Sequence, residues 1–117
     1  MRVLCVYRPG TAESDRPPTE LEMNTMGALI GEMMKAGVLL GAEGCRPSKY
    51  GARVRIDGKN EFAVTDGPFP ETKELIQGFC LLQVKSMPEA VEWTKRFLAV
   101  VGEGETEIRL LSENPAA

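Results

Sequence analysis

The sequence predicts an α+β domain in which two helices cover one face of an antiparallel sheet. Its apolar and polar runs follow the order strand, helix, strand, hairpin, strand, helix, strand, so two β-α-β halves flank an inserted hairpin. A capping box precedes each predicted helix, and an Asp-Gly turn separates the two hairpin strands. With 117 residues, the chain is long enough for a single core. We expect one domain over residues 1–112 and a flexible tail over residues 113–117.

The first half is predicted as strand, helix and strand. An apolar run over residues 3–7 gives the first strand, and a polar, proline-containing loop follows it to residue 18. Thr19 and Glu22 form a capping box, and Gly37 is expected to end the helix as its C′ residue. Gly27 and Gly31 lie on one side of this helix, where we expect a strand to approach closely. Residues 38–42 give the second strand.

The second half begins with the hairpin. Residues 53–56 and 61–65 flank the Asp57-Gly58 turn. Residues 79–84 read as the next strand, with Gly78 as a bulge before it. A capping box at Ser86 opens the second helix, and residues 106–111 form the last strand.

Both faces of the central strands are apolar, which predicts a homodimer. Val3, Cys5 and Tyr7 point to one side of the first strand, while Leu4 and Val6 point to the other. An antiparallel sheet with one wet face should instead alternate apolar and polar residues. Because two helices cover only one face, we expect a second copy to cover the other, in a closed two-fold dimer.

Composition restricts the function classes. A net charge of −3 without a basic cluster argues against direct binding of nucleic acid, and no apolar run is long enough to span a membrane. The chain has no histidine, so it can form neither a Ser-His-Asp triad nor an imidazole metal site. Its three cysteines have no C-x-x-C spacing, which is typical of reduced thiols in a cytoplasmic protein. We expect no metal and no cofactor.

The most informative segment runs from Thr65 to Glu74. Asp66-Gly67-Pro68 is strong turn chemistry, since Asp bonds its own backbone, Gly accepts positive φ and Pro fixes φ. Pro70 adds a second rigid point, and charged side chains then gather on the segment. A connecting turn needs the first feature but not the last, so the segment is a candidate site.

This segment resembles the signature of the DGPF proteins of the YCII-related superfamily. Gly37-Val38-Leu39, residues 44–48 and residues 89–93 are similar to further parts of that family. The resemblance covers roughly residues 1–112 and implies a ferredoxin-like domain that forms a dimeric, α/β barrel-like assembly. It implies no settled activity. The YCII branch has a His-Asp pair as its proposed catalytic centre. This chain has no histidine, so that mechanism does not carry over, and only the Asp of the pair could be kept.

Five residues are the candidates for a site. Asp66 is either a residue that caps its own turn or a partly buried carboxylate acting as a general acid or base. Glu71 and Lys73 either belong to a solvated turn or supply a second carboxylate and an anion clamp. Arg46 either ends a loop or binds a carboxylate or phosphate, and Tyr7 either edges the core or contacts a ligand through its hydroxyl.

Two functions therefore stand side by side. The first is a cofactor-independent enzyme or binding protein for a small anionic or carbonyl-bearing molecule, in a pocket near Asp66; whether it catalyses a reaction is left open. The second, which the resemblance implies, is a non-catalytic regulatory module associated with an extracytoplasmic-function sigma factor. A pocket of several hundred Å³ would favour the first, and a flat apolar patch outside the dimer interface would favour the second.

Overall fold

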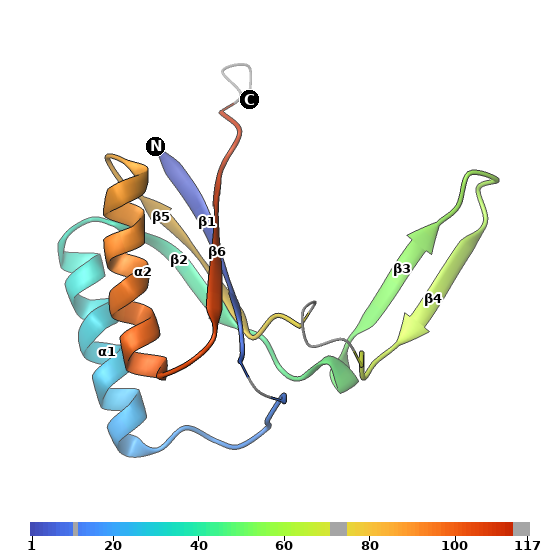
Figure 1. The fold of residues 1–117 in the computed structure, drawn as a ribbon, viewed down its shortest axis with the longest axis horizontal. Helices are drawn as coiled ribbons and strands as arrows, with labels where there is room; N and C mark the ends of the chain where they lie inside the picture. Colours follow the sequence, from blue (N-terminus) through green and yellow to red (C-terminus); the bar gives the residue numbers. More distant parts are fainter. Residues whose placement is uncertain (11, 71–74, 114–117) are drawn as a thin grey trace.

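A four-stranded antiparallel sheet with two helices on one face forms the body of the protein (Figure 1). The structure is a computed structural model that describes residues 1–10, 12–70 and 75–113. The sheet has the strand order β2-β5-β1-β6. Its strands are β1 (Arg2–Arg8), β2 (Leu39–Gly44), β5 (Gly78–Gln83) and β6 (Glu105–Leu110), and the helices are α1 (Glu20–Lys35) and α2 (Met87–Val101). The predicted α+β class is confirmed.

The hairpin forms a second, two-stranded sheet that projects from the body. Its strands are β3 (Ala52–Ile56) and β4 (Phe62–Asp66), and a short 3-10 turn, η1 (Ser48–Tyr50), precedes them. Figure 1 shows the hairpin extending on the side of the sheet opposite to the helices. The radius of gyration is 16.4 Å. A compact chain of this length would have a radius of gyration of about 13.4 Å. The projecting hairpin explains why the observed value is larger.

The helix ends form as the sequence predicts. The Thr19 hydroxyl accepts a hydrogen bond from the Glu22 amide at 3.1 Å, and the Ser86 hydroxyl accepts one from the Glu89 amide at 3.2 Å. At the end of α1, the Gly37 amide donates to the Met34 carbonyl and the Val38 amide to the Met33 carbonyl. This is a Schellman motif, and Gly37 takes the left-handed conformation at φ 71° that its C′ residue requires.

The main core lies between the helices and the inner face of the sheet. Val3, Cys5 and Tyr7 of β1 are all buried, as their alternation predicts, and Leu82 of β5 is buried beside them. The residues that make up the core cluster are Val3, Cys5, Leu29, Met33, Val38, Leu82, Val84 and Ala90. None of the helices in the described residues is long and apolar enough to cross a membrane.

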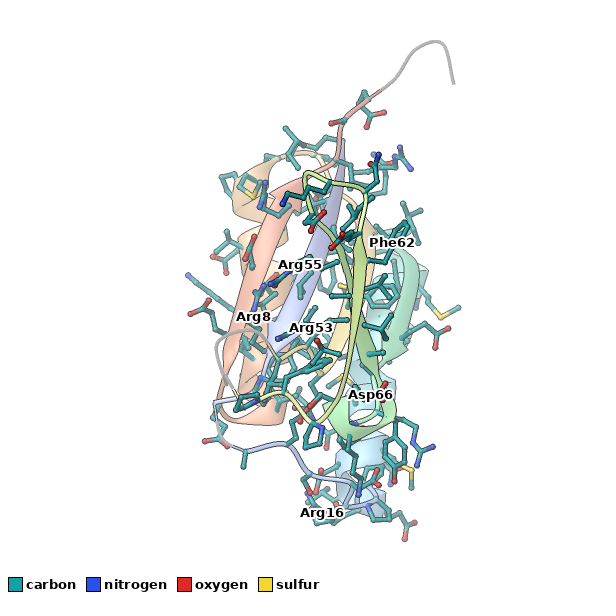
Figure 2. The ribbon with its side chains drawn as sticks, turned by 90° about the vertical axis from the view of Figure 1, so that its right-hand side faces the viewer. Arg8, Arg16, Arg53, Arg55, Phe62 and Asp66 are labelled. Atoms are coloured by element: carbon teal, nitrogen blue, oxygen red, sulfur yellow. The ribbon has the colours of Figure 1, made fainter. Side chains whose placement is uncertain are left out.

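The outer face of the sheet remains apolar and partly open. Leu4 and Val6 of β1 are half-buried, and Phe79 of β5 is exposed. The hairpin has a similar face, because cross-strand pairs place four apolar side chains on one side of it. They are Val54, Ile56, Phe62 and Val64, which we call the apolar face of the hairpin, and all four are exposed. Figure 2 shows Arg53 and Arg55 on the opposite side of the hairpin from Phe62.

Two local predictions are wrong. Gly27 and Gly31 face open space, with no atom within 4 Å of where a Cβ would lie, so no strand approaches α1 there. The irregularity in the sheet lies in β2, where the register shifts between Leu39 and Gly41, rather than at Gly78. Gly78 pairs regularly with Tyr7, and a Cβ there would lie 3.0 Å from the Glu43 carbonyl oxygen. The absence of a side chain at Gly78 therefore allows β2 to lie close to β5 at this point. Of the predicted tail, only Glu113 is described; residues 114–117 lie outside the described residues.

Candidate functional site in the cavity between sheet and helices

A cavity of about 390 Å³ lies between the inner face of the sheet and the two helices. This volume is within the range of about 300–1,000 Å³ that is typical of small-molecule sites. Strand residues form one wall, and mainly apolar residues of α1 and α2 form the other. The described lining residues are Cys5, Tyr7, Met26, Leu29, Ile30, Met33, Leu39, Ala42, Glu43, Gly44, Gln77, Gly78, Phe79, Cys80, Leu82, Trp93, Thr94, Phe97, Val101 and Thr106.

Tyr7 is held firmly in the wall of this cavity. Its hydroxyl donates a hydrogen bond of 2.6 Å to the Glu103 carbonyl, and its ring meets the Phe97 ring edge-on at 5.3 Å between centroids. Gly104 backs the tyrosine at φ 115°, and a Cβ there would lie 2.6 Å from the Tyr7 ring. Burial raises the pKa of Tyr7, and the Glu103 carboxylate raises it further. The phenol therefore stays protonated near neutral pH.

Thr106 supplies a buried polar group to the cavity wall. It pairs with Tyr7 across the β1–β6 ladder, and it lines the cavity. Its hydroxyl oxygen is buried, and it finds no hydrogen-bond partner among the residues that the structure describes. Such a group costs about 1–3 kcal/mol of stability, so its retention calls for an explanation such as a ligand or an ordered water.

The charge around the cavity favours an uncharged ligand. Glu43 is the acidic residue among the described lining residues, and none of those residues is Lys or Arg. Glu43 pairs with Phe79 across the β2–β5 ladder, so its carboxylate points to the outer face, and none of the described lining residues offers a charged side chain that would hold an anion in the cavity. Of the two kinds of ligand that the sequence suggested, this cavity suits the carbonyl-bearing kind.

The Asp66–Phe69 segment lies elsewhere, at the base of the hairpin. Asp66 ends β4, is exposed, and is not among the described residues that line the cavity. Gly67 passes so close to the Ser48 carbonyl that a Cβ would overlap it, so a side chain cannot be placed there. The Phe69 amide donates to the Ser48 hydroxyl at 3.0 Å, and that hydroxyl donates to the Glu13 carboxylate at 2.6 Å. These contacts fasten the hairpin to η1 and to the loop after β1.

Arg46 also lies outside the cavity. Its guanidinium stacks 3.7 Å from the centre of the Tyr50 ring and lies 3.9 Å from the Asp15 carboxylate. The Tyr50 hydroxyl donates to that carboxylate at 2.8 Å, and the Lys49 ammonium is 3.8 Å from it. Arg46 also borders a smaller hollow beside the loop after β1, of about 10 Å³. This cluster is built from surface pairs, each of which contributes little to stability.

The structure thus separates the predicted site residues. Tyr7 lines the cavity, whereas Asp66 and Arg46 lie near the hairpin base; Glu71 and Lys73 fall outside the described residues. The sequence reading assigned no ligand role to Thr106, Cys5 or Cys80. The available signal was strand alternation, which places Cys5 and Tyr7 on one face. Among the described residues, no group of three or more Cys, Asp or Glu is placed to hold a metal ion.

The fold and cavity define a small α+β domain with a ligand-sized space between sheet and helices. The family model for the YCII-related domain matches residues 1–113, so this chain belongs to the YCII-related family. No curated protein matches the sequence. Among solved structures, the chain is similar to 5-chloro-2-hydroxyhydroquinone dehydrochlorinase from Burkholderia phenoliruptrix AC1100, in complex with 2,5-dihydroxybenzoquinone. The two share 13% identity, with 97% of each chain covered and a TM-score of 0.45.

Proposed function

We propose that this chain binds a small uncharged ring compound that carries a carbonyl or hydroxyl oxygen, in the cavity between sheet and helices. The observation that carries this proposal is the buried Thr106 hydroxyl, which lacks a described partner and belongs to a mainly apolar cavity of about 390 Å³. A flat ring suits walls that include Tyr7, Trp93 and Phe97, because aromatic side chains favour stacked or edge-on contact with another ring.

The polar groups in the cavity have distinct roles in this proposal. The Thr106 oxygen is buried in the structure, so rotation of this side chain is what brings its hydroxyl to the ligand oxygen in this proposal. Tyr7 already donates to the Glu103 carbonyl, so its oxygen remains available to accept a hydrogen bond from a ligand hydroxyl. Its raised pKa keeps it protonated, so it meets the ligand as an uncharged phenol. A catalytic role for Asp66 stays a prediction, tested below.

The test is a thermal-shift screen with a library of small quinones, phenols and cyclic ketones. The variant Thr106→Val keeps the shape of the side chain and removes the hydroxyl. For the free protein we expect the unfolding free energy to rise by about 1–2 kcal/mol, because an unpaired buried polar group is lost. For the best ligand we expect affinity to fall by roughly tenfold, which corresponds to about 1.4 kcal/mol.

The control is Thr25→Val, which removes an exposed hydroxyl on α1 that donates to the Leu21 carbonyl at 2.8 Å. It should leave ligand affinity unchanged. If Thr106→Val is stabilised and binds every hit as tightly as the wild type, Thr106 has no ligand role. If no library compound stabilises the wild type, the proposed ligand class is wrong.

We also propose that the chain forms a homodimer in which a second copy covers the outer face of the sheet and the apolar face of the hairpin. The hairpin projects on the side of the sheet that the helices leave uncovered (Figure 1). An isolated two-stranded hairpin is only marginally stable in water, so an exposed one with four apolar side chains calls for a cover. Two-fold symmetry supplies the same pair of surfaces twice. This assembly is the dimeric, barrel-like form that the family resemblance implies.

The regulatory alternative predicts a different result for the same hairpin. A module that docks on a sigma factor would keep a flat apolar patch free outside the dimer interface, so the apolar face of the hairpin would stay exposed in the isolated protein. The three free cysteines support a reducing compartment, and we propose the cytoplasm as the location.

A further inference from the structure

Two cysteines from distant parts of the sequence meet in the middle of the sheet. Cys5 of β1 and Cys80 of β5 are direct partners in the antiparallel ladder. The Cα atoms of such partners lie about 4.5 or 5.5 Å apart, depending on the hydrogen-bonding position. Both values fall within the range of about 4.4–6.8 Å that a disulfide can span. The backbone therefore meets the Cα–Cα requirement for a disulfide between these two residues.

Both thiols also lie on the side of the sheet where chemistry is accessible. Direct partners in a ladder point to the same face, and each of these cysteines lines the cavity between sheet and helices. Cys5 is buried, whereas Cys80 is half-buried. A small molecule that enters the cavity can therefore reach the pair without unfolding of the sheet.

The surroundings of the pair favour one thiolate at a time. The neighbouring Cys80 thiol lowers the pKa of Cys5 by hydrogen bonding, against the opposing effect of burial, and the Thr94 hydroxyl lowers it further. Hydrogen bonding to Cys5 raises the pKa of Cys80, and burial adds to that rise. Because a thiolate is the reactive form of cysteine, the direction of these shifts favours Cys5 as the first thiol to react and Cys80 as the second.

We propose that Cys5 and Cys80 form a modification site, a dithiol that a peroxide-class oxidant closes into a disulfide across β1 and β5 from within the cavity. This inference goes beyond the proposed ligand function and does not depend on it, since it needs the cavity only as a route. Cys45 takes no part. It is exposed and lies just beyond the end of β2, outside the β1–β5 ladder.

The reaction balances in two steps. The Cys5 thiolate attacks one peroxide oxygen, the O–O bond breaks, and the departing hydroxide takes a proton to leave as water, so Cys5 becomes a sulfenic acid. The Cys80 sulfur then attacks the Cys5 sulfur, its proton and the sulfenic hydroxyl leave as a second water, and the S–S bond forms. Two thiols are oxidised and one hydrogen peroxide is reduced.

The test treats the native full-length protein with a small excess of hydrogen peroxide and counts free thiols after denaturation in the presence of an alkylating agent. The wild type has three cysteines, and we expect one free thiol after oxidation. Mass spectrometry should show the loss of two hydrogens in the unreduced chain, and peptide mapping should join the Cys5 peptide to the Cys80 peptide.

Two variants keep the proposal open to refutation. Cys45→Ser should lose two thiols at the rate of the wild type. Cys80→Ser should form no intramolecular disulfide, and its Cys5 sulfenic acid should be trapped by dimedone. A second measurement covers the case in which Cys80→Ser does not fold. Phenylarsine oxide binds two adjacent thiols with loss of one water, and we expect it to bind Cys45→Ser roughly a hundredfold more tightly than Cys5→Ser, because the second As–S bond is intramolecular.

Either of two results would overturn the proposal. One is a wild type that retains three thiols in peroxide while Cys45→Ser retains two. The other is a disulfide that maps to Cys45, within one chain or between chains.

Discussion

The apolar face of the hairpin gives the sharpest test of how this protein assembles. Val64 and Ala63 are neighbours in β4 and point to opposite sides of the hairpin; Val64 pairs with Val54 and Ala63 with Arg55. Val64→Glu places a charge in the middle of the apolar face. Ala63→Glu adds the same charge one residue away, beside an arginine, and is therefore a matched control.

The expected effect follows from the exposure of the four side chains. Val54, Ile56, Phe62 and Val64 are 68%, 52%, 72% and 65% exposed. Complete burial of such a side chain is worth about 1.5–3 kcal/mol, so covering the exposed part gives roughly 1–2 kcal/mol each and about 8–16 kcal/mol for two symmetric arms. Association itself costs an estimated 4–15 kcal/mol or more, so the arms matter to whether the dimer forms. Val64→Glu acts twice per dimer and should weaken association by at least about 3 kcal/mol, more than a hundredfold.

The assay is size-exclusion chromatography with light scattering over a dilution series, with circular dichroism as the check on folding. The wild type and Ala63→Glu should have twice the chain mass at micromolar concentration, and Val64→Glu should be a folded monomer. A wild type that is a monomer would refute the dimer. A Val64→Glu protein that stays dimeric with an unchanged dissociation constant would show that the hairpin is outside the interface.

Three further results follow from the structure. Asp66→Asn should leave the melting temperature within a few degrees, since Asn suits turn positions as Asp does; if Asp66 is catalytic, ligand binding or turnover will be lost, and if it only shapes the turn, both will be kept. Gly31→Ala, at an exposed helix position with open space around it, should raise the unfolding free energy by about 1 kcal/mol in chemical denaturation, and a decrease would mean that another molecule covers this side of α1. The raised pKa of Tyr7 means that the folded protein holds the phenolic proton more tightly than the unfolded chain, whose tyrosine has the ordinary pKa of about 10. This contribution to stability is complete below that pH and is lost as pH rises above it, so Tyr7→Phe should show a weaker fall in stability in alkaline denaturant titrations, and equal slopes would contradict the assignment.

Much of the fold follows from local sequence signals. The caps at Thr19 and Ser86, the Gly37 stop and the Asp57 turn act within a few residues, so the chain itself carries the information. The register shift in β2 does not, because it depends on how Leu39 and Gly41 meet a strand that lies forty residues away. The expected close approach of a strand at Gly27 and Gly31 fails for a similar reason. Small residues allow such an approach, but the packing of helix and sheet decides whether it occurs.

The site was predictable only in part. Alternation placed Tyr7 and Cys5 on the inner face, and the structure agrees. The cavity itself arises because the side chains of the helices do not fill the space above that face, and this depends on helix position rather than on any one residue. The Thr106 hydroxyl lacks a partner among the described residues because of where β6 lies beside β1, and no pattern in its own segment reveals this. Asp66 ends β4 at the base of the hairpin, and its role as a site residue stays a prediction.

The contact between Gly67 and Ser48 has a consequence for how relatives of this chain are recognised. The close approach leaves no room for a side chain at Gly67, so the Asp66–Phe69 segment holds the base of the hairpin against η1. This contact restricts the residue at position 67 to glycine, whatever ligand the cavity on the other side of the sheet holds. Proteins that carry this segment should therefore share the projecting hairpin and its contact with η1. Their ligand preferences should be inferred from the side chains that line the cavity.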